Sequence, residues 1–252
     1  MRTFLAVAAF GLLSTVSAQA ADLPSGYGTG DYFGNIYTAV AGYEIPSVSS
    51  DINTNYTLGG HFAYDPAVQG FGYQVDGLVR YGSATSDISW YQLTGHVTDI
   101  MANGMKVGAF VGYDKTQTAS LGAEVLYSLS DATWVQAQIA LLDPTKTGEL
   151  GWGVGGSINH HLTQNVSLRA EAAYNDYPTP GLSAYGAEIG MLYTFDETPV
   201  SVGLSAGYNR MITSAAVLDE YQVSLKLQYS FGGTAEGAQG KLFRTSVLGL
   251  DP

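Results

Sequence analysis

The sequence predicts an all-β protein: a transmembrane antiparallel up-and-down β-barrel of about twelve strands, with ten or fourteen strands as alternatives. Three observations lead to this prediction. Alternation of apolar with small or polar residues recurs along most of the chain, short clusters of turn residues separate the runs, and no stretch after the N-terminal segment holds the roughly 18 consecutive apolar residues that a spanning helix needs.

The clearest strand covers residues 70–81. Apolar residues and one glycine occupy its odd positions from Phe71 to Tyr81, whereas Gln74, Asp76 and Arg80 stand at even positions. Because successive side chains of a strand point to opposite faces, one face is apolar and the other polar. The same alternation predicts strands at 35–45, 53–64, 70–82, 87–99, 104–114, 118–129, 132–142, 149–162, 165–175, 184–195, 199–209 and 220–231.

Prolines and connection lengths support this division. All eight prolines fall outside these runs or at the first residue of one, where the missing N–H costs no ladder hydrogen bond. Connections such as 65–69, 130–132 and 196–199 are short enough only for antiparallel neighbours. The predicted topology is therefore a meander.

The N-terminus predicts export. Residues 1–20 combine Arg2, an apolar run and a small-residue ending, which is typical of a signal peptide cleaved after Ala20. An uncleaved anchor is the alternative, but the apolar run is shorter than the roughly 20 residues of a spanning helix. We expect a periplasmic lead-in at 21–34, the barrel at 35–231 and a periplasmic tail at 232–252.

The two faces of the strands predict a membrane barrel. If the apolar faces pointed inward, the lumen would have to hold more large side chains than it has room for. A soluble two-sheet sandwich is the alternative. Aromatic residues gather toward both ends of the strands, as the two interfaces of a bilayer require. They are Tyr56, Tyr81, Tyr91, Tyr113, Trp152, Tyr174, Tyr185, Tyr208 and Tyr221 at one end, and Phe62, Tyr64, Phe71, Tyr73, Tyr127, Tyr193, Phe195, Tyr229 and Phe231 at the other.

The pattern over residues 35–231 resembles the bacterial outer-membrane β-barrel superfamily, which includes porins. Its most specific element is the last strand, YQVSLKLQYSF, which resembles the aromatic-ended strand that the barrel assembly machinery recognises. The segment AADLP resembles mature N-termini of small alphaproteobacterial outer-membrane proteins. One departure is that residues 232–252 follow Phe231. The resemblance implies a place in the bacterial outer membrane, in contact with its lipid and lipopolysaccharide.

Composition excludes several other classes. Ten Lys and Arg stand against 22 Asp and Glu, giving a net charge of −12, and loss of Arg2 with the signal would lower it by one. Nucleic acid is therefore disfavoured as a partner.

The segment 151–156 formally matches the dinucleotide fingerprint, but strand alternation runs straight through it where a turn and a helix are needed. We expect no cofactor.

The four histidines are the candidates for catalysis. Some members of the superfamily are lipases, lipid A deacylases or proteases, and such sites need a base beside a nucleophile or water. We predict that His61, His96 and His161 face the lumen toward the periplasmic end and that His160 faces outward. The acyl chains of surface lipid A lie in the opposite leaflet. We therefore predict structural or lining histidines, no enzyme and no metal site.

Charged residues on the inward faces are the most informative for function. Such residues either pair across the lumen and close it or line a water-filled path. We expect a porin-like channel for passive diffusion of small hydrophilic solutes, with mild cation preference at most. The alternatives are a closed structural or surface-interaction barrel and, less favoured, an outer-membrane lipid hydrolase. The predicted pore-lining residues, four of each sign, are Asp76, Arg80, Lys106, Glu124, Arg169, Glu171, Glu188 and Lys226.

The tail holds an apolar patch that includes Leu242, Phe243 and Leu248 beside basic residues. Such a segment is either a tail without fixed structure, a contact for a periplasmic partner or a plug that enters the barrel from below. The sequence alone leaves these alternatives open.

Overall fold

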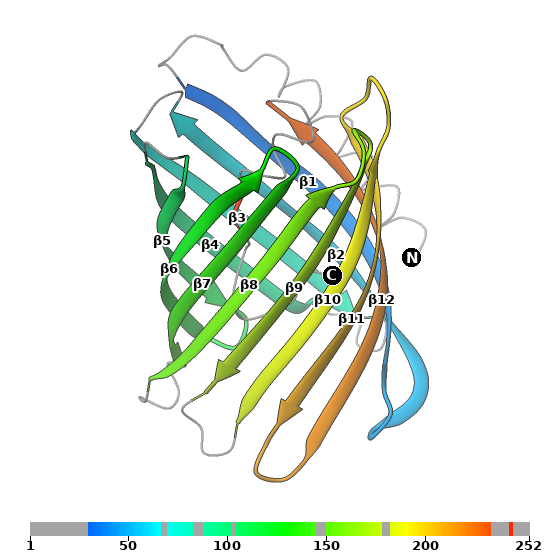
Figure 1. The fold of residues 1–252 in the computed structure, drawn as a ribbon. Helices are drawn as coiled ribbons and strands as arrows, with labels where there is room; N and C mark the ends of the chain where they lie inside the picture. Colours follow the sequence, from blue (N-terminus) through cyan, green and yellow to red (C-terminus); the bar gives the residue numbers. More distant parts are fainter. Residues whose placement is uncertain are drawn as a thin grey trace.

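A computed structural model describes residues 30–66, 70–82, 88–101, 104–144, 150–177, 182–232 and 242–243. Over these residues the chain forms a closed barrel in which every strand pairs antiparallel with its neighbours in sequence and the first strand pairs with the last (Figure 1). The strands are β1 (Gly30–Ile45), β2 (Ser49–Pro66), β3 (Gly70–Gly82), β4 (Ile88–Ile100), β5 (Lys106–Asp114), β6 (Thr118–Ser130), β7 (Thr133–Pro144), β8 (Gly151–His161), β9 (Val166–Asp176), β10 (Ser183–Thr194), β11 (Val200–Ile212) and β12 (Val217–Phe231).

The predicted fold class and the twelve strands are confirmed. The main difference is at the first strand, which begins at Gly30 and not at residue 35. There Tyr32 pairs with Tyr64 and Phe33 with Ala63, so the end of the predicted lead-in belongs to the barrel. Glycines on both sides of this aromatic pair hide the alternation in the sequence. The predicted signal peptide and its cleavage site lie outside the described residues.

The even number of strands places the start of β1 and the end of β12 at one end of the barrel, at the top of Figure 1, which we call the terminal end. The opposite end, which we call the far end, carries the β1–β2 and β11–β12 hairpins. Among the described residues, no helix is long and apolar enough to cross a membrane.

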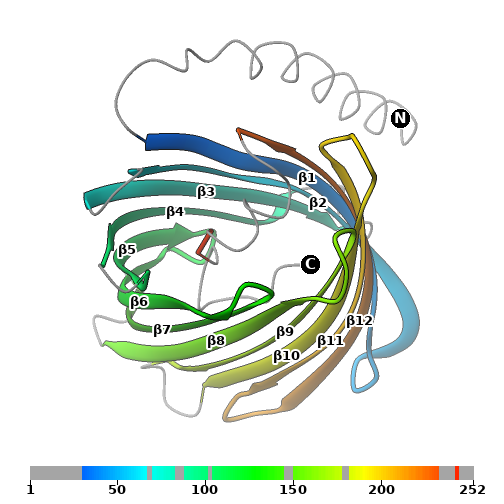
Figure 2. The same ribbon diagram turned by 45° about the horizontal axis from the view of Figure 1, so that its top comes forward.

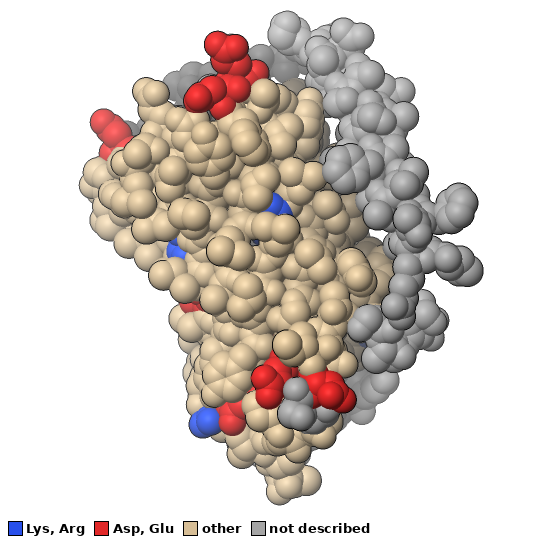
Figure 3. All heavy atoms as spheres, turned by 90° about the vertical axis from the view of Figure 1, so that its right-hand side faces the viewer, with Lys and Arg blue, Asp and Glu red and all other residues tan. Residues whose placement is uncertain are grey.

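The outward face is apolar and carries an aromatic belt near each end. At the far end, the ring of Tyr208 lies 6.4 Å from that of Tyr185 and 5.2 Å from that of Tyr221. At the terminal end, the ring of Tyr32 lies 5.9 Å from that of Phe62 and 4.9 Å from that of Tyr64. Figure 3 shows one side of the molecule, on which the acidic side chains that are visible gather mostly near the two ends. This distribution is typical of a barrel that spans a bilayer.

The inward face carries large aromatic rings as well as small and polar residues. The Tyr37 ring covers Gly59 on β2, and the Phe110 ring covers Gly122 on β6. A Cβ atom at Gly59 would lie 2.5 Å from the Tyr37 ring, and one at Gly122 would lie 2.3 Å from the Phe110 ring. These glycines therefore provide room for aromatic rings in the lumen, because any side chain there would clash with the ring.

Candidate functional site: the lumen

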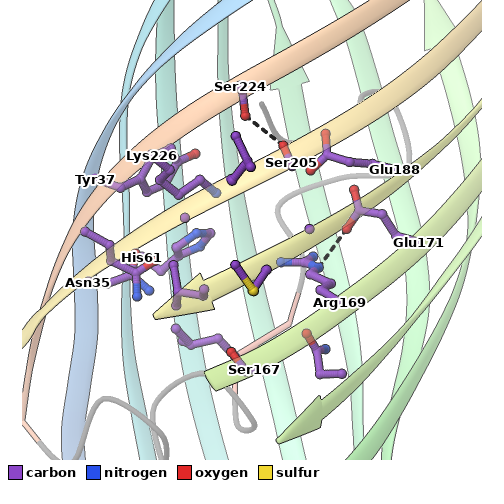
Figure 4. Close-up of a pocket in the computed structure, with 18 of the residues that line it drawn as sticks. Asn35, Tyr37, His61, Ser167, Arg169, Glu171, Glu188, Ser205, Ser224 and Lys226 are labelled. Atoms are coloured by element: carbon purple, nitrogen blue, oxygen red, sulfur yellow. Dashed lines mark hydrogen bonds and ion pairs between the residues drawn. The ribbon is translucent and has the colours of Figure 1, made fainter. Parts of the chain in front are cut away.

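The lumen is divided into an open half and a filled half. The open half is a cavity of about 940 Å³, part of it open to solvent, and most of its wall comes from β8 to β12 and β1 (Figure 4). Its charged lining residues are Arg169 and Glu171 from β9, Glu188 from β10 and Lys226 from β12. The filled half lies against β2 to β6, where buried side chains occupy the interior.

The acidic side of the cavity is formed by two glutamates that lie side by side on the neighbouring strands β9 and β10. Glu171 and Glu188 are direct register partners, a like-charge arrangement that needs compensation. The Arg169 Nε atom lies 2.7 Å from the Glu171 Oε2 atom, and the Gln222 Nε2 group donates to the Glu188 Oε2 atom at 3.1 Å. The Gln222 side chain reaches Glu188 across Gly207 of the intervening strand.

The basic side of the cavity includes Lys226, whose Nζ atom lies 4.6 Å from the centre of the Tyr37 ring, a cation–π distance. Between Lys226 and Glu188, the hydroxyl groups of Ser205 and Ser224 form a hydrogen bond of 2.7 Å. Figure 4 shows Lys226 and Tyr37 together on one side of the cavity and the two glutamates on the other. Charges of both signs thus face the same water-accessible space.

The filled half is organised around Asp76, which is fully buried. Its carboxylate accepts a hydrogen bond from Gln74 Nε2 at 2.8 Å and lies 3.0 Å from His61 Nδ1 and 2.9 Å from His96 Nε2. The other ring nitrogen of His96 lies 2.7 Å from Glu124 Oε1. We call Gln74, His61, Asp76, His96 and Glu124 the buried network.

Lys106 closes the filled half toward the terminal end. Its Nζ atom lies 2.8 Å from Asp65 Oδ1, and both side chains are almost completely buried. Phe33 lies on the same side, with its ring centre 6.0 Å from the Lys106 Nζ atom. A buried ion pair of this kind stabilises little by itself, but removing one partner is costly.

The eight predicted pore-lining residues therefore separate into groups. Arg169, Glu171, Glu188 and Lys226 line the cavity. Asp76, Lys106 and Glu124 lie on the inward face, as expected, but their charges are held in the buried contacts of the filled half and away from the open space. Arg80 is half-buried on the inward side of β3, near the far end, and is not among the residues that line the cavity.

The histidines lie on the predicted faces. His61 lines the cavity while its Nδ1 atom lies 3.0 Å from Asp76 Oδ1. Both ring nitrogens of His96 lie within hydrogen-bond distance of carboxylates, which leaves neither nitrogen to take a proton from a nucleophile. His161 packs edge-on against Trp134, with 4.7 Å between ring centres. His160 is exposed on the outer side, where its Nδ1 atom lies 2.9 Å from the hydroxyl oxygen of Thr133.

Sequence reasoning missed the aromatic content of the lumen. Phe33, Tyr37 and Phe110 are buried on inward positions, and Phe243 of the tail is buried beside them. The strand parity that placed Lys106 inward also places Phe110 inward, so this signal was available. For the tail, the apolar pair Leu242 and Phe243 was the only signal, and it did not identify the contact surface.

Comparison with solved structures shows the same architecture at low identity. A KdgM porin matches with a TM-score of 0.52 and 12% identity, over 77% of this chain and 99% of that chain. The CymD monoaromatic hydrocarbon channel matches with a TM-score of 0.50 and 8% identity, over 81% of this chain and 88% of that chain. The chain has the fold of an outer-membrane β-barrel. No protein-family model matches the sequence, and no curated protein matches it either.

Proposed function

We propose that the protein is a bacterial outer-membrane channel through which small hydrophilic solutes diffuse passively. The observation that carries this proposal is the cavity lined by Arg169, Glu171, Glu188 and Lys226 inside a barrel whose outer face is apolar. A lumen that holds charges of both signs offers water and polar solutes a favourable path, whereas an apolar lumen would exclude them.

The surroundings of the barrel are part of the same proposal. The two aromatic belts fit the interfaces of a bilayer, so the outer face contacts membrane lipid and, at the far end, lipopolysaccharide. The aromatic end of β12 is the element that the barrel assembly machinery would recognise during biogenesis. Export by a signal peptide cleaved after Ala20 would deliver the chain to this machinery.

The conductance of the purified protein tests the channel. We expect the full-length mature chain, reconstituted in a planar lipid bilayer, to give discrete current steps in potassium chloride. The same preparation unfolded by heat is the control and should give none. A correctly folded barrel that stays silent over repeated insertions would overturn the proposal. It would favour a closed structural barrel, for which the filled half of the lumen is the supporting observation.

The charges of the cavity predict the ion selectivity. Glu188→Gln removes a negative charge from the cavity wall and is expected to lower the permeability ratio of potassium to chloride about two-fold. Lys226→Gln removes a positive charge and is expected to raise the same ratio by a similar factor. The reversal potential in a potassium chloride gradient measures this ratio, at low ionic strength because salt screens the charges.

Asp131 provides the control for these substitutions. It lies exposed in the turn between β6 and β7, outside the lumen, so Asp131→Asn should leave the reversal potential unchanged. Shifts of the same sign in Glu188→Gln and Lys226→Gln would contradict the assignment of these residues to the ion path.

A further inference from the structure

Two residues of the tail lie inside the barrel although they follow the last strand. Figure 2 shows the Leu242–Phe243 segment, in red, within the ring of strands on the side of β4 and β5. Phe243 is 1% exposed, as deeply buried as the residues of the barrel core. Both residues also form part of the cavity wall, so they stand at the boundary between the open and the filled half.

The backbone of Phe243 is held by the side chain of Gln74. The Gln74 Nε2 group donates to the Phe243 carbonyl oxygen at 2.8 Å, and the Phe243 backbone N–H donates to the Gln74 Oε1 atom at 2.9 Å. One amide side chain thus satisfies both backbone groups of a single residue, much as a neighbouring strand would. The Gln74 Nε2 group also donates to the Asp76 carboxylate, which fixes the orientation of the amide.

The side chains of the segment fit two different surfaces. The Phe243 ring lies nearly parallel to the His96 ring, with 6.1 Å between the centres and 6° between the planes. The Lys106 Nζ atom lies 5.2 Å from the centre of the Phe243 ring, within cation–π distance. Leu242 packs against the buried pair Phe33 and Ala63. The backbone groups of Phe243, its aromatic ring and the side chain of Leu242 therefore each make a specific contact with residues of the barrel.

We infer that Gln74, His96 and Lys106 form a binding site in the lumen for an aromatic residue of a peptide, and that the chain's own Phe243 occupies it as an intramolecular plug. The inference rests on the proposed channel function, because a plug has meaning only where the lumen conducts. With the site occupied, solutes pass through the open half alone. With the site empty, the path widens on the side of the filled half.

Full-length variants test the plug in planar bilayers. Phe243→Ala removes the ring, and Gln74→Ala together with Phe243→Ala also removes the backbone contact. We expect the unit conductance of both variants to rise, because the path through the lumen widens. The rise should be limited to a factor of about 1.5 to 2, because the wall of the filled half still carries its own buried side chains. Phe195→Ala is the matched control, since Phe195 lies exposed beyond β10, and it should conduct as the wild type does.

A peptide added from solution tests the binding site separately. A synthetic peptide of residues 240–246, GKLFRTS, should restore the lower conductance of the Phe243→Ala variant when it is added at one side of the bilayer. The same peptide with alanine in place of phenylalanine keeps its charge and should have no effect. Equal block by both peptides would overturn the proposed recognition of the aromatic ring.

A disulfide test separates this inference from the channel function. The chain has no cysteine, so the pair Ala63→Cys and Leu242→Cys can be introduced without competing thiols. We expect it to cross-link under mild oxidation, whereas Val75→Cys with Leu242→Cys should not, because Val75 faces outward. If the cysteine pair cross-links but the barrel never conducts, the proposed binding of the tail is supported and the proposed channel function is overturned. Absence of cross-linking, with Phe243→Ala conducting like the wild type, would overturn the plug.

Discussion

Replacement of Asp76 by alanine is expected to lower the free energy of unfolding by about 3–5 kcal/mol. This is the cost of removing one charged side chain from a buried set of groups that interact with it. The side chain accepts hydrogen bonds at the centre of the buried network and is completely inaccessible to solvent. Its loss leaves Gln74, His61 and His96 without their shared acceptor, and Gln74 and His96 are themselves buried. Unfolding in urea, followed by tryptophan fluorescence of the reconstituted barrel, measures the change.

Asp219 provides a matched comparison for Asp76. It pairs with Arg210 near the far end of β11 and β12, where both side chains are about a third exposed. An ion pair in such a position contributes little to stability because solvent screens it, so Asp219→Ala should have a small effect. If the two substitutions lowered stability equally, the buried network would not be the organising element of the filled half.

The fold could be predicted almost completely from the sequence, because strand alternation and lipid contact depend on local pattern. The strand at residues 70–82 has the predicted bounds, and the belt residues Tyr185, Tyr208 and Tyr221 pack together as their positions indicated. The start of β1 was harder to predict from the sequence, because glycine carries no hydropathy signal. Local pattern therefore fixes the strands and the outward face of this barrel.

The contacts inside the lumen depend on register over several strands, which local pattern does not determine. Glu124 on β6 meets His96 on β4 because Gly108 on the strand between them leaves room. A Cβ atom at Gly108 would lie 2.7 Å from the Glu124 Oε1 atom. The sequence placed both residues inward, but it did not show that they pair across an intervening strand.

The docking of the tail could be predicted least. Gln74 and Phe243 are 169 positions apart in the sequence, and no repeating pattern relates them. Of the three alternatives for the apolar patch, the contacts of Leu242 and Phe243 favour the plug. The rest of the patch, including Leu248, lies outside the described residues.

Arginine substitutions at two neighbouring positions of β11 should separate the lipid face from the functional face. Leu204 is exposed on the outer face near the middle of the strand, and Ser205 lines the cavity at the same depth. Leu204→Arg is expected to lower the free energy of unfolding by about 2–4 kcal/mol, the cost of a basic side chain at the middle of the lipid face. Urea unfolding in lipid vesicles measures the change.

Ser205→Arg places the same charge one residue away, in water. It loses the hydrogen bond to Ser224, so we expect a destabilisation of only about 1 kcal/mol. Its main effect should be functional, because a new positive charge between Lys226 and Glu188 lowers the permeability ratio of potassium to chloride and narrows the path. A large loss of stability in Ser205→Arg, with little in Leu204→Arg, would reverse the assignment of the two faces and with it the location of the channel.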